Sequence, residues 1–189
     1  MRIGILGGTF NPIHIGHLIL GEEALWKLKL DRVIYIPAYL PPHKSEEEII
    51  GAEDRYAMTL LAVEGNPKFE VSRLEIESKQ RSYTIDTLKK LIKQYGPRAE
   101  FFFITGSDSL KELVSWKQID EIYKLSKFIV ATRPGFPLRE VPSEIQAVVI
   151  TEIEVSASEI RKRLKERKSI RYLVPDKVRE YIAAHHLYQ

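Results

Sequence analysis

Six short apolar runs are spaced along the first 150 residues, and this spacing restricts the folds that the chain can adopt. Helical patterns lie between most of them, at about 13–28, 52–64, 84–95 and 107–123. Strands that alternate with helices form parallel sheets covered on both faces. The sequence therefore predicts an α/β fold with a Rossmann-like, doubly wound parallel sheet. The expected strands are 3–6, 33–36, 69–71, 101–105, 128–131 and 147–150.

The pattern changes near residue 152, where strands give way to helices. Helices are expected at about 156–166 and 175–187, the second beginning at Pro175. The sequence has no internal repeat and no long linker. A length of 189 residues suits one domain. We expect a single domain over 1–189 with residues 152–189 as its C-terminal helical portion.

Composition narrows the functional classes. A formal charge of +3 is too small to indicate a nucleic-acid partner, and 44% hydrophobic residues argue against disorder. The absence of cysteine excludes thiol chemistry and favours a reducing compartment. No apolar run approaches the roughly 20 residues of a membrane span, and no signal-peptide pattern is present. We expect a cytoplasmic protein without a membrane partner; the sequence leaves homo-oligomerisation open.

The segment Gly7-Gly8-Thr9-Phe10-Asn11-Pro12-Ile13-His14-Ile15-Gly16-His17 links the first apolar run to the first helical pattern. A glycine loop between a strand and a helix start is a place where α/β proteins hold phosphate. We expect Gly7 and Gly8 to permit a tight turn and close approach of a ligand. Pro12 suits the first helical turn.

His14 and His17 are spaced to share one helical face, with about 5–6 Å between Cβ atoms. Two imidazoles beside a glycine loop suit a polyphosphate that gains charge during a reaction. Each part alone has a structural explanation, and two histidines could be half of a zinc site. A zinc site needs more ligands, and the sequence has neither cysteine nor an HExxH motif.

Other unusual residues also follow the predicted strands. Ligands of open α/β sheets bind beyond the carboxyl ends of the strands, so these segments should meet at one rim. Each has a structural alternative: Lys44 could solubilise a loop, Asp108 could cap a helix, Trp116 could belong to the core, and Ser156 or Ser158 could cap a helix. The segments are Pro37–Lys44, Thr105–Ser109, Thr132–Gly135 and Val155–Arg161.

The first motif resembles the signature of the nucleotidyltransferase superfamily that shares the sequence HxGH. Its members transfer a nucleotidyl group from a nucleoside triphosphate to a phosphate. The segment is not a GxGxxG fingerprint, and it is not a P-loop because Glu22 stands where a lysine is needed. Later motifs, in order along the chain, resemble the bacterial nicotinate-nucleotide adenylyltransferases. They are Pro41–Lys44, Ser82–Leu88, Gly106–Leu110, Trp116, Arg133–Leu138 and Leu173–Pro175 with the closing Leu187-Tyr188.

This resemblance implies a reaction of NAD biosynthesis. The 5′-phosphate of nicotinate mononucleotide attacks the α-phosphorus of ATP, pyrophosphate leaves, and nicotinate adenine dinucleotide forms without a covalent intermediate. Mg²⁺ would be held through the ATP phosphates and water, with no metal site of the protein's own. The implied catalytic residues are His14, His17, Lys44 and Arg161. ATP is implied to contact Gly7, Gly8, Thr9, Phe10, Gly106, Asp108, Arg133 and Ser156, and nicotinate mononucleotide Thr84, Trp116 and Lys117.

The chain departs from the family pattern at three positions. Ala157 and Ser158 replace residues that are often serine and threonine, and Lys117 stands where some relatives carry tyrosine. The alternatives are a sister adenylyltransferase acting on nicotinamide mononucleotide or phosphopantetheine, an RNA-binding protein or synthetase fragment, and a nucleotide sensor. The HIGH sequence and the basic run 161–168 favour the RNA alternative, but the synthetase KMSKS motif is absent.

Overall fold

The computed structural model describes residues 1–42, 45, 47, 49–107, 110, 113, 115–132, 142–151 and 153–189. This part of the chain forms a six-stranded sheet in the order β3-β2-β1-β4-β5-β6, in which every pair is parallel. That order is typical of a doubly wound Rossmann sheet and confirms the predicted fold class. The strands are β1 (Arg2–Gly8), β2 (Arg32–Pro37), β3 (Phe69–Val71), β4 (Glu100–Gly106), β5 (Lys127–Thr132) and β6 (Ile145–Val149).

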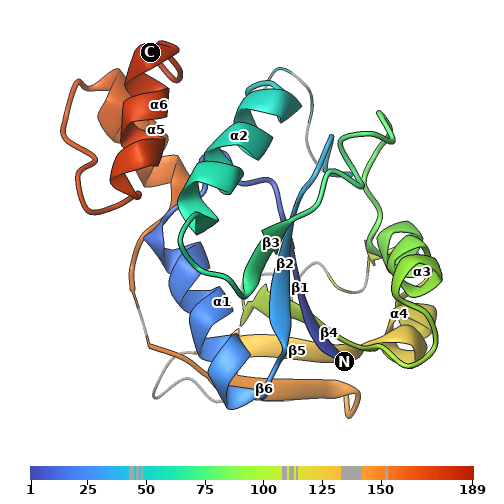
Figure 1. The fold of residues 1–189 in the computed structure, drawn as a ribbon. Coiled ribbons are helices and arrows are strands. Elements are labelled where there is room, and N and C mark those ends of the chain that lie inside the picture. Colours follow the sequence, from blue (N-terminus) through green and yellow to red (C-terminus); the bar gives the residue numbers. More distant parts are fainter. Residues whose placement is uncertain are drawn as a thin grey trace.

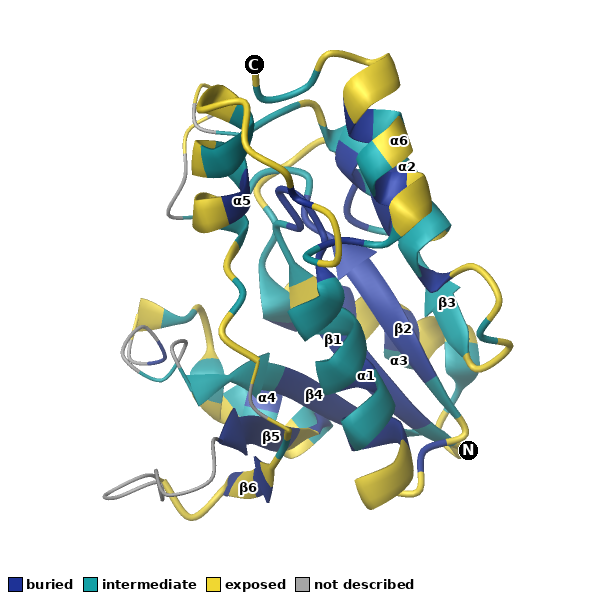
Figure 2. Cartoon of the chain, turned by 90° about the vertical axis from the view of Figure 1, so that its left-hand side faces the viewer, coloured by how far each residue is buried: buried dark blue, intermediate teal, exposed yellow. Residues whose placement is uncertain are grey.

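Helices cover both faces of the sheet (Figure 1). One face packs on α3 (Thr84–Tyr95) and α4 (Ile119–Leu125), and α1 (Ile15–Lys27) covers the other together with α2 (Ala52–Val63). The alternation of side chains along a strand explains the two cores: Ile3 and Ile5 of β1 face α3, whereas Leu6 faces α1. The central strands are buried (Figure 2), as their uninterrupted apolar runs predict.

The last two helices, α5 (Ala157–Lys165) and α6 (Asp176–Ala184), lie at one end of the molecule, where α6 packs beside α2 (Figure 1). Ile160 of α5 and Ile182 of α6 belong to the same apolar cluster as Met58 of α2. The hydroxyl of Tyr181 on α6 also donates to Oδ1 of Asp54 on α2, at 3.0 Å. The C-terminal helices are therefore packed on the sheet's own core.

The predicted helix over 107–123 is confirmed only in its last part, where α4 (Ile119–Leu125) lies. In the described part of that segment, α4 begins only at Ile119, and short 3₁₀ turns precede it. The reason is Gln118, whose backbone is left-handed, at φ 55° and ψ 47°. A left-handed residue cannot belong to a right-handed helix, so the chain changes direction there before α4 begins.

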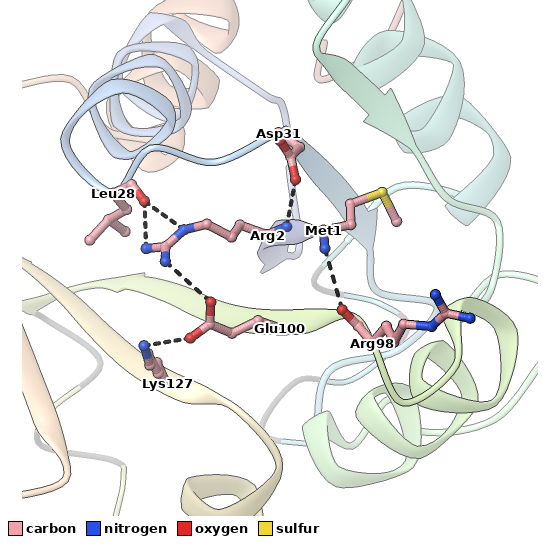
Figure 3. A network of polar contacts seen from close by, with 7 residues as sticks. All are labelled: Met1, Arg2, Leu28, Asp31, Arg98, Glu100 and Lys127. Carbon is pink, nitrogen blue, oxygen red and sulfur yellow. Dashed lines mark hydrogen bonds and ion pairs between the residues drawn. The ribbon is translucent and has the colours of Figure 1, made fainter.

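A polar network lies at the amino ends of β1, β4 and β5, at the edge opposite the predicted ligand rim (Figure 3). The guanidinium of Arg2 donates to the carbonyl of Leu28 at 2.8 Å and pairs with Glu100 at 3.2 Å. Lys127 binds the other oxygen of Glu100 at 2.5 Å, and the backbone N–H of Arg2 donates to Asp31 at 2.7 Å. These charged groups satisfy one another and join neighbouring strands.

No helix in the described ranges combines the length and the apolar character needed to cross a membrane.

Candidate active site

A cavity of about 490 Å³ lies at the carboxyl ends of β1, β2 and β4. The strand order reverses between β1 and β4, and ligands of doubly wound sheets bind at that point. The predicted residues Gly7, Gly8, Thr9, Thr84, Trp116 and Lys117 all line this cavity. Its other described lining residues are Ile5, Ile36, Ala38, Pro41, Pro42, Glu75, Ser82, Tyr83, Thr87, Phe103, Thr105, Ser115 and Ile122.

The two glycines of the first motif do not form the expected turn. They are the last residues of β1, where Gly7 pairs with Ile36 and Gly8 with Pro37. The left-handed residue is Phe10, at φ 48°, and its ring is buried. A Cβ on Gly8 would lie 2.9 Å from that ring. Gly8 is therefore required by close packing of Phe10, and not by its own backbone conformation.

The two histidines do not share a helical face; instead, their rings stack at the start of α1. His14 is not helical: it is the N-cap of α1, with an extended backbone at φ −146°, and Pro12 lies in the preceding turn. The imidazoles of His14 and His17 stack with their centroids 3.7 Å apart. The backbone N–H of His14 donates to Nδ1 of His17 at 3.2 Å. Because Nδ1 of His17 accepts this bond, a neutral His17 carries its proton on Nε2.

Burial sets the charge of both imidazoles. It lowers the pKa of His14 to about 4. It also lowers the pKa of His17 well below its usual range, and the adjacent His14 adds to this effect. Both rings are therefore neutral near pH 7 in the unliganded chain. Within the described residues, Nδ1 of His14 is buried without a hydrogen-bond partner. A buried, unpaired nitrogen of this kind is a candidate ligand contact.

Gly16, which lies between the two histidines, makes room for this arrangement. A Cβ at Gly16 would lie 3.1 Å from Nδ1 of His14 and 3.9 Å from the carbonyl oxygen of Val155. The contact with His14 would be tight, whereas the one with Val155 would be ordinary, so the absence of a side chain serves the close approach of the His14 ring. The role of Gly16 was not predicted from the sequence, although its place between the two histidines was a signal.

The start of α5 reaches the same region. Ser156 is the N-cap of α5, and its Oγ accepts a hydrogen bond from the N–H of Glu159 at 3.2 Å. Of the two serines that could cap this helix, Ser156 and Ser158, the cap is therefore Ser156. Arg161 donates through Nη1 to the carbonyl of Asn11 at 2.8 Å. The structure therefore brings Arg161 to the turn that precedes His14, as the motif positions predicted.

The predicted residues form two adjacent groups. Thr84, Trp116 and Lys117 line the cavity, whereas Phe10, His14, His17, Ser156 and Arg161 are not among its described lining residues. The segment Gly7–Asn11 joins the groups, because it lines the cavity at one end and contacts Arg161 at the other.

Gly106 ends β4 opposite Ala131 of β5, and its neighbour Thr105 lines the cavity. The positions Lys44, Asp108 and Arg133 lie outside the described residues.

Comparison with known proteins shows the family. Residues 5–163 match the family model described as cytidylyltransferase-like. A protein of Moorella thermoacetica named probable nicotinate-nucleotide adenylyltransferase is 44% identical over 199 residues, covering 100% of this chain and 92% of the relative. One of the same name from Thermus thermophilus is 45% identical over 189 residues, covering 100% of both. This chain belongs to the nicotinate-nucleotide adenylyltransferase family.

Solved structures agree on the fold of this family member. The nicotinic acid mononucleotide adenylyltransferase of Plasmodium falciparum, complexed with NaAD, superposes with a TM-score of 0.81 at 22% identity. That match covers 99% of this chain and 97% of the other. The same enzyme complexed with APC gives a TM-score of 0.79 at 21% identity, covering 99% and 96%. The resemblance inferred from the motifs is thus confirmed by full-length relatives and by the fold.

Trp116 and Lys117 precede α4; Trp116 packs on the sheet, and Lys117 contacts the start of α3. The Trp116 ring packs nearly perpendicular to Phe103, with centroids 5.6 Å apart. Nζ of Lys117 pairs with Oδ2 of Asp86 at 3.1 Å and lies 4.6 Å from the centroid of the Tyr83 ring. The side chain that departs from the family pattern therefore places an ammonium group at the cavity wall, where it is partly neutralised by Asp86.

Sequence reasoning missed Arg55, a fully buried side chain on α2. Its guanidinium donates to the carbonyls of Thr9 at 2.7 Å, Ala38 at 2.6 Å and Tyr39 at 2.7 Å. Arg55 thus fixes the segments that follow β1 and β2, both of which border the cavity. The signal was its register: it shares the inner face of α2 with Met58, where an apolar residue is expected.

No group of three or more histidine, cysteine or acidic side chains among the described residues is arranged to hold a metal ion.

Proposed function

We propose that this chain transfers the adenylyl group of ATP to nicotinate mononucleotide, giving nicotinate adenine dinucleotide and pyrophosphate in NAD biosynthesis. Full-length identity of 44–45% to relatives that carry this name supports the proposal. The structural observation that carries it is the junction of two sites. One segment, Gly7–Asn11, borders both a cavity suited to a flat acceptor ring and a histidine pair suited to phosphate.

The reaction is an in-line displacement at phosphorus. A 5′-phosphate oxygen of nicotinate mononucleotide forms a bond to the α-phosphorus, and the bond from that phosphorus to the bridging oxygen of the β-phosphate breaks. The electron pair of the broken bond stays on the leaving pyrophosphate. No protein nucleophile is required, so the chain contributes positioning and charge stabilisation. A divalent cation, proposed to be Mg²⁺, would add positive charge on the phosphates, which are its preferred ligands.

The histidine pair is proposed to act on the α- and β-phosphates. The proton on Nε2 of His17 can be donated to a phosphate oxygen as a hydrogen bond that strengthens when charge develops there. A guanidinium has five N–H donors, so the bond from Arg161 to Asn11 leaves capacity for the outer phosphates. Ser156 uses its oxygen as a cap acceptor and retains its hydroxyl proton for a phosphate. Lys44, Asp108 and Arg133 keep their proposed ATP roles from the motif positions alone.

The acceptor is proposed to bind in the cavity. Trp116 provides an aromatic surface for the pyridine ring. Thr84 is the first residue of α3, and no side chain caps this helix at Tyr83. The positive end of the α3 dipole therefore faces the cavity and favours an anion there. The ammonium of Lys117 has the same sign, so both features favour the carboxylate of nicotinate.

The direct test is to incubate the purified chain with ATP, Mg²⁺ and nicotinate mononucleotide and to separate the products by chromatography. The proposal expects nicotinate adenine dinucleotide and pyrophosphate in equal amounts, and neither product when one substrate is omitted. Consumption of ATP without the dinucleotide would contradict it.

A further inference from the structure

Glu75 is a buried acidic side chain on the wall of the acceptor cavity. It lies in the segment between β3 and α3, and only 9% of its surface is exposed. The hydroxyl of Thr87 on α3 donates to its Oε1 at 2.5 Å, and the hydroxyl of Ser82 also binds the carboxylate. These two residues flank Thr84, which is proposed to contact the acceptor.

Ser82 extends this contact to the loop that follows β2. Its Oγ accepts a hydrogen bond from the backbone N–H of Tyr39 at 3.0 Å, and its own N–H donates to the carbonyl of Leu40 at 3.0 Å. Arg55 binds the same residue, donating to the carbonyl of Tyr39 at 2.7 Å. Tyr39 is thus held between the buried Arg55 of α2 and the Ser82–Glu75 pair.

We propose that Glu75 is a positioning residue for the acceptor, fixing the start of α3 and the loop after β2 in one arrangement around the cavity. The inference rests on the proposed function, because it assumes that the cavity binds nicotinate mononucleotide. It assigns a role to a carboxylate that would otherwise be unfavourable beside an anionic acceptor.

The chemistry of the site supports this role. A buried carboxylate is costly unless it is hydrogen bonded, and Thr87 and Ser82 supply the donors. Burial raises the pKa of the Glu75 carboxyl, whereas the bonds from Thr87 and Ser82 and the charges of Lys90 and Arg55 lower it. An apolar residue of similar size would remove the acceptor that Thr87 and the half-buried Ser82 share. Thr87 would keep only its longer bond to the carbonyl of Tyr83, at 3.3 Å, and the start of α3 would be held less firmly.

The experiment compares Glu75→Met, Glu75→Gln and the control Glu77→Gln by steady-state kinetics. Met removes both acceptor oxygens at similar size, whereas Gln keeps one. Glu77 lies in the same segment but is exposed, with 69% of its side chain accessible. We expect the KM for nicotinate mononucleotide to rise about five- to twentyfold in Glu75→Met and less in Glu75→Gln. The KM for ATP should stay within about twofold, and Glu77→Gln should match the wild type.

A second pair covers the case in which Glu75→Met does not fold. Thr87→Val removes the donor to Glu75 and Thr87→Ser restores it, so the acceptor KM should rise in the first and return to within about twofold in the second. Two results overturn the inference: an unchanged acceptor KM in folded Glu75 or Thr87 variants, or an equal rise in both KM values.

If the wild type makes no dinucleotide, the proposed function fails and this inference fails with it. Normal wild-type turnover with unchanged variants overturns this inference alone.

Discussion

The hydroxyl of Tyr188 donates a hydrogen bond to Oδ1 of Asn11 at 2.8 Å, joining the end of the chain to the turn before His14. The carbonyl of the same Asn11 accepts from Arg161. Burial raises the pKa of the Tyr188 hydroxyl, so it remains a donor at neutral pH. The C-terminal segment therefore supports the turn on which the proposed phosphate contacts depend.

Removing this hydroxyl should weaken both stability and catalysis. We expect Tyr188→Phe to lose about 1 kcal/mol of unfolding free energy, which lowers Tm by roughly 2–4 °C for a chain of this size. The kcat/KM for ATP should also fall, because the turn that holds Arg161 is less restrained. Thermal unfolding and initial rates measure the two effects. Tyr172→Phe is the control, since that side chain is 81% exposed, and equal behaviour of the two variants would contradict this role.

His17 should matter mainly in the transition state. We expect His17→Ala to lower kcat at least about a hundredfold, roughly 2.7 kcal/mol, with a much smaller change in ATP binding. The physical reason is that a neutral donor gains strength as charge develops on the phosphates. Single-turnover rates and ATP titrations separate the two quantities, and His186→Ala provides an exposed control. A kcat within about threefold of the wild type would show that His17 has no such role.

The buried His14 should make folding pH-dependent. Its pKa is about 4 in the folded chain and near 6.5 when unfolded, so below pH 6.5 the unfolded state binds a proton that the folded state does not. Its contribution to stability is present above pH 6.5 and is lost as pH falls towards 4. Between pH 7 and pH 5 the unfolding free energy of the wild type should fall by roughly 2 kcal/mol more than that of His14→Gln. Urea unfolding at both pH values measures this, and parallel losses would contradict the assignment.

The sequence predicted the sheet well because its central strands are continuous apolar runs, such as that of β4, where Phe101, Phe102, Phe103 and Ile104 are all buried. It failed where a single backbone conformation decides the outcome. Gln118 interrupts the predicted helix before α4, and the left-handed residue near the first motif is Phe10, whereas the tight turn was expected at Gly7 and Gly8. Glutamine and phenylalanine do not favour positive φ, so no local sequence pattern indicated these left-handed conformations.

The candidate site shows the same division. Motif spacing pointed to His14 and His17, which lie at the start of α1. The family resemblance pointed to Thr84 and Trp116, which line the cavity. It missed Arg55 and Glu75, whose importance comes from burial and from partners far along the chain. A charged residue on the inner face of a helix is detectable in the sequence, but its partners are a property of the fold.

Trp116 should affect acceptor binding without affecting acceptor choice. We expect Trp116→Ala to lower kcat/KM similarly for nicotinate mononucleotide and its amide, by roughly 1–1.5 kcal/mol or about five- to tenfold, because stacking does not sense the charge. Trp26→Ala is the matched control, since that tryptophan is 69% exposed on α1 and is not a lining residue of the cavity. A fall in kcat/KM for only one of the two acceptors would argue against a stacking role.

Acceptor choice tests the account most directly. The measurement is kcat/KM of the wild type with ATP and each of three acceptors: nicotinate mononucleotide, nicotinamide mononucleotide and phosphopantetheine. The start of α3 and the ammonium of Lys117 favour a carboxylate, whereas a carboxamide places its own NH₂ donor against them. Loss of one charged hydrogen bond, roughly 1.5–3 kcal/mol, predicts a preference for nicotinate mononucleotide of about ten- to a hundredfold over its amide. Phosphopantetheine should give no measurable turnover. Equal values for the acid and the amide, or faster turnover of phosphopantetheine, would contradict the account.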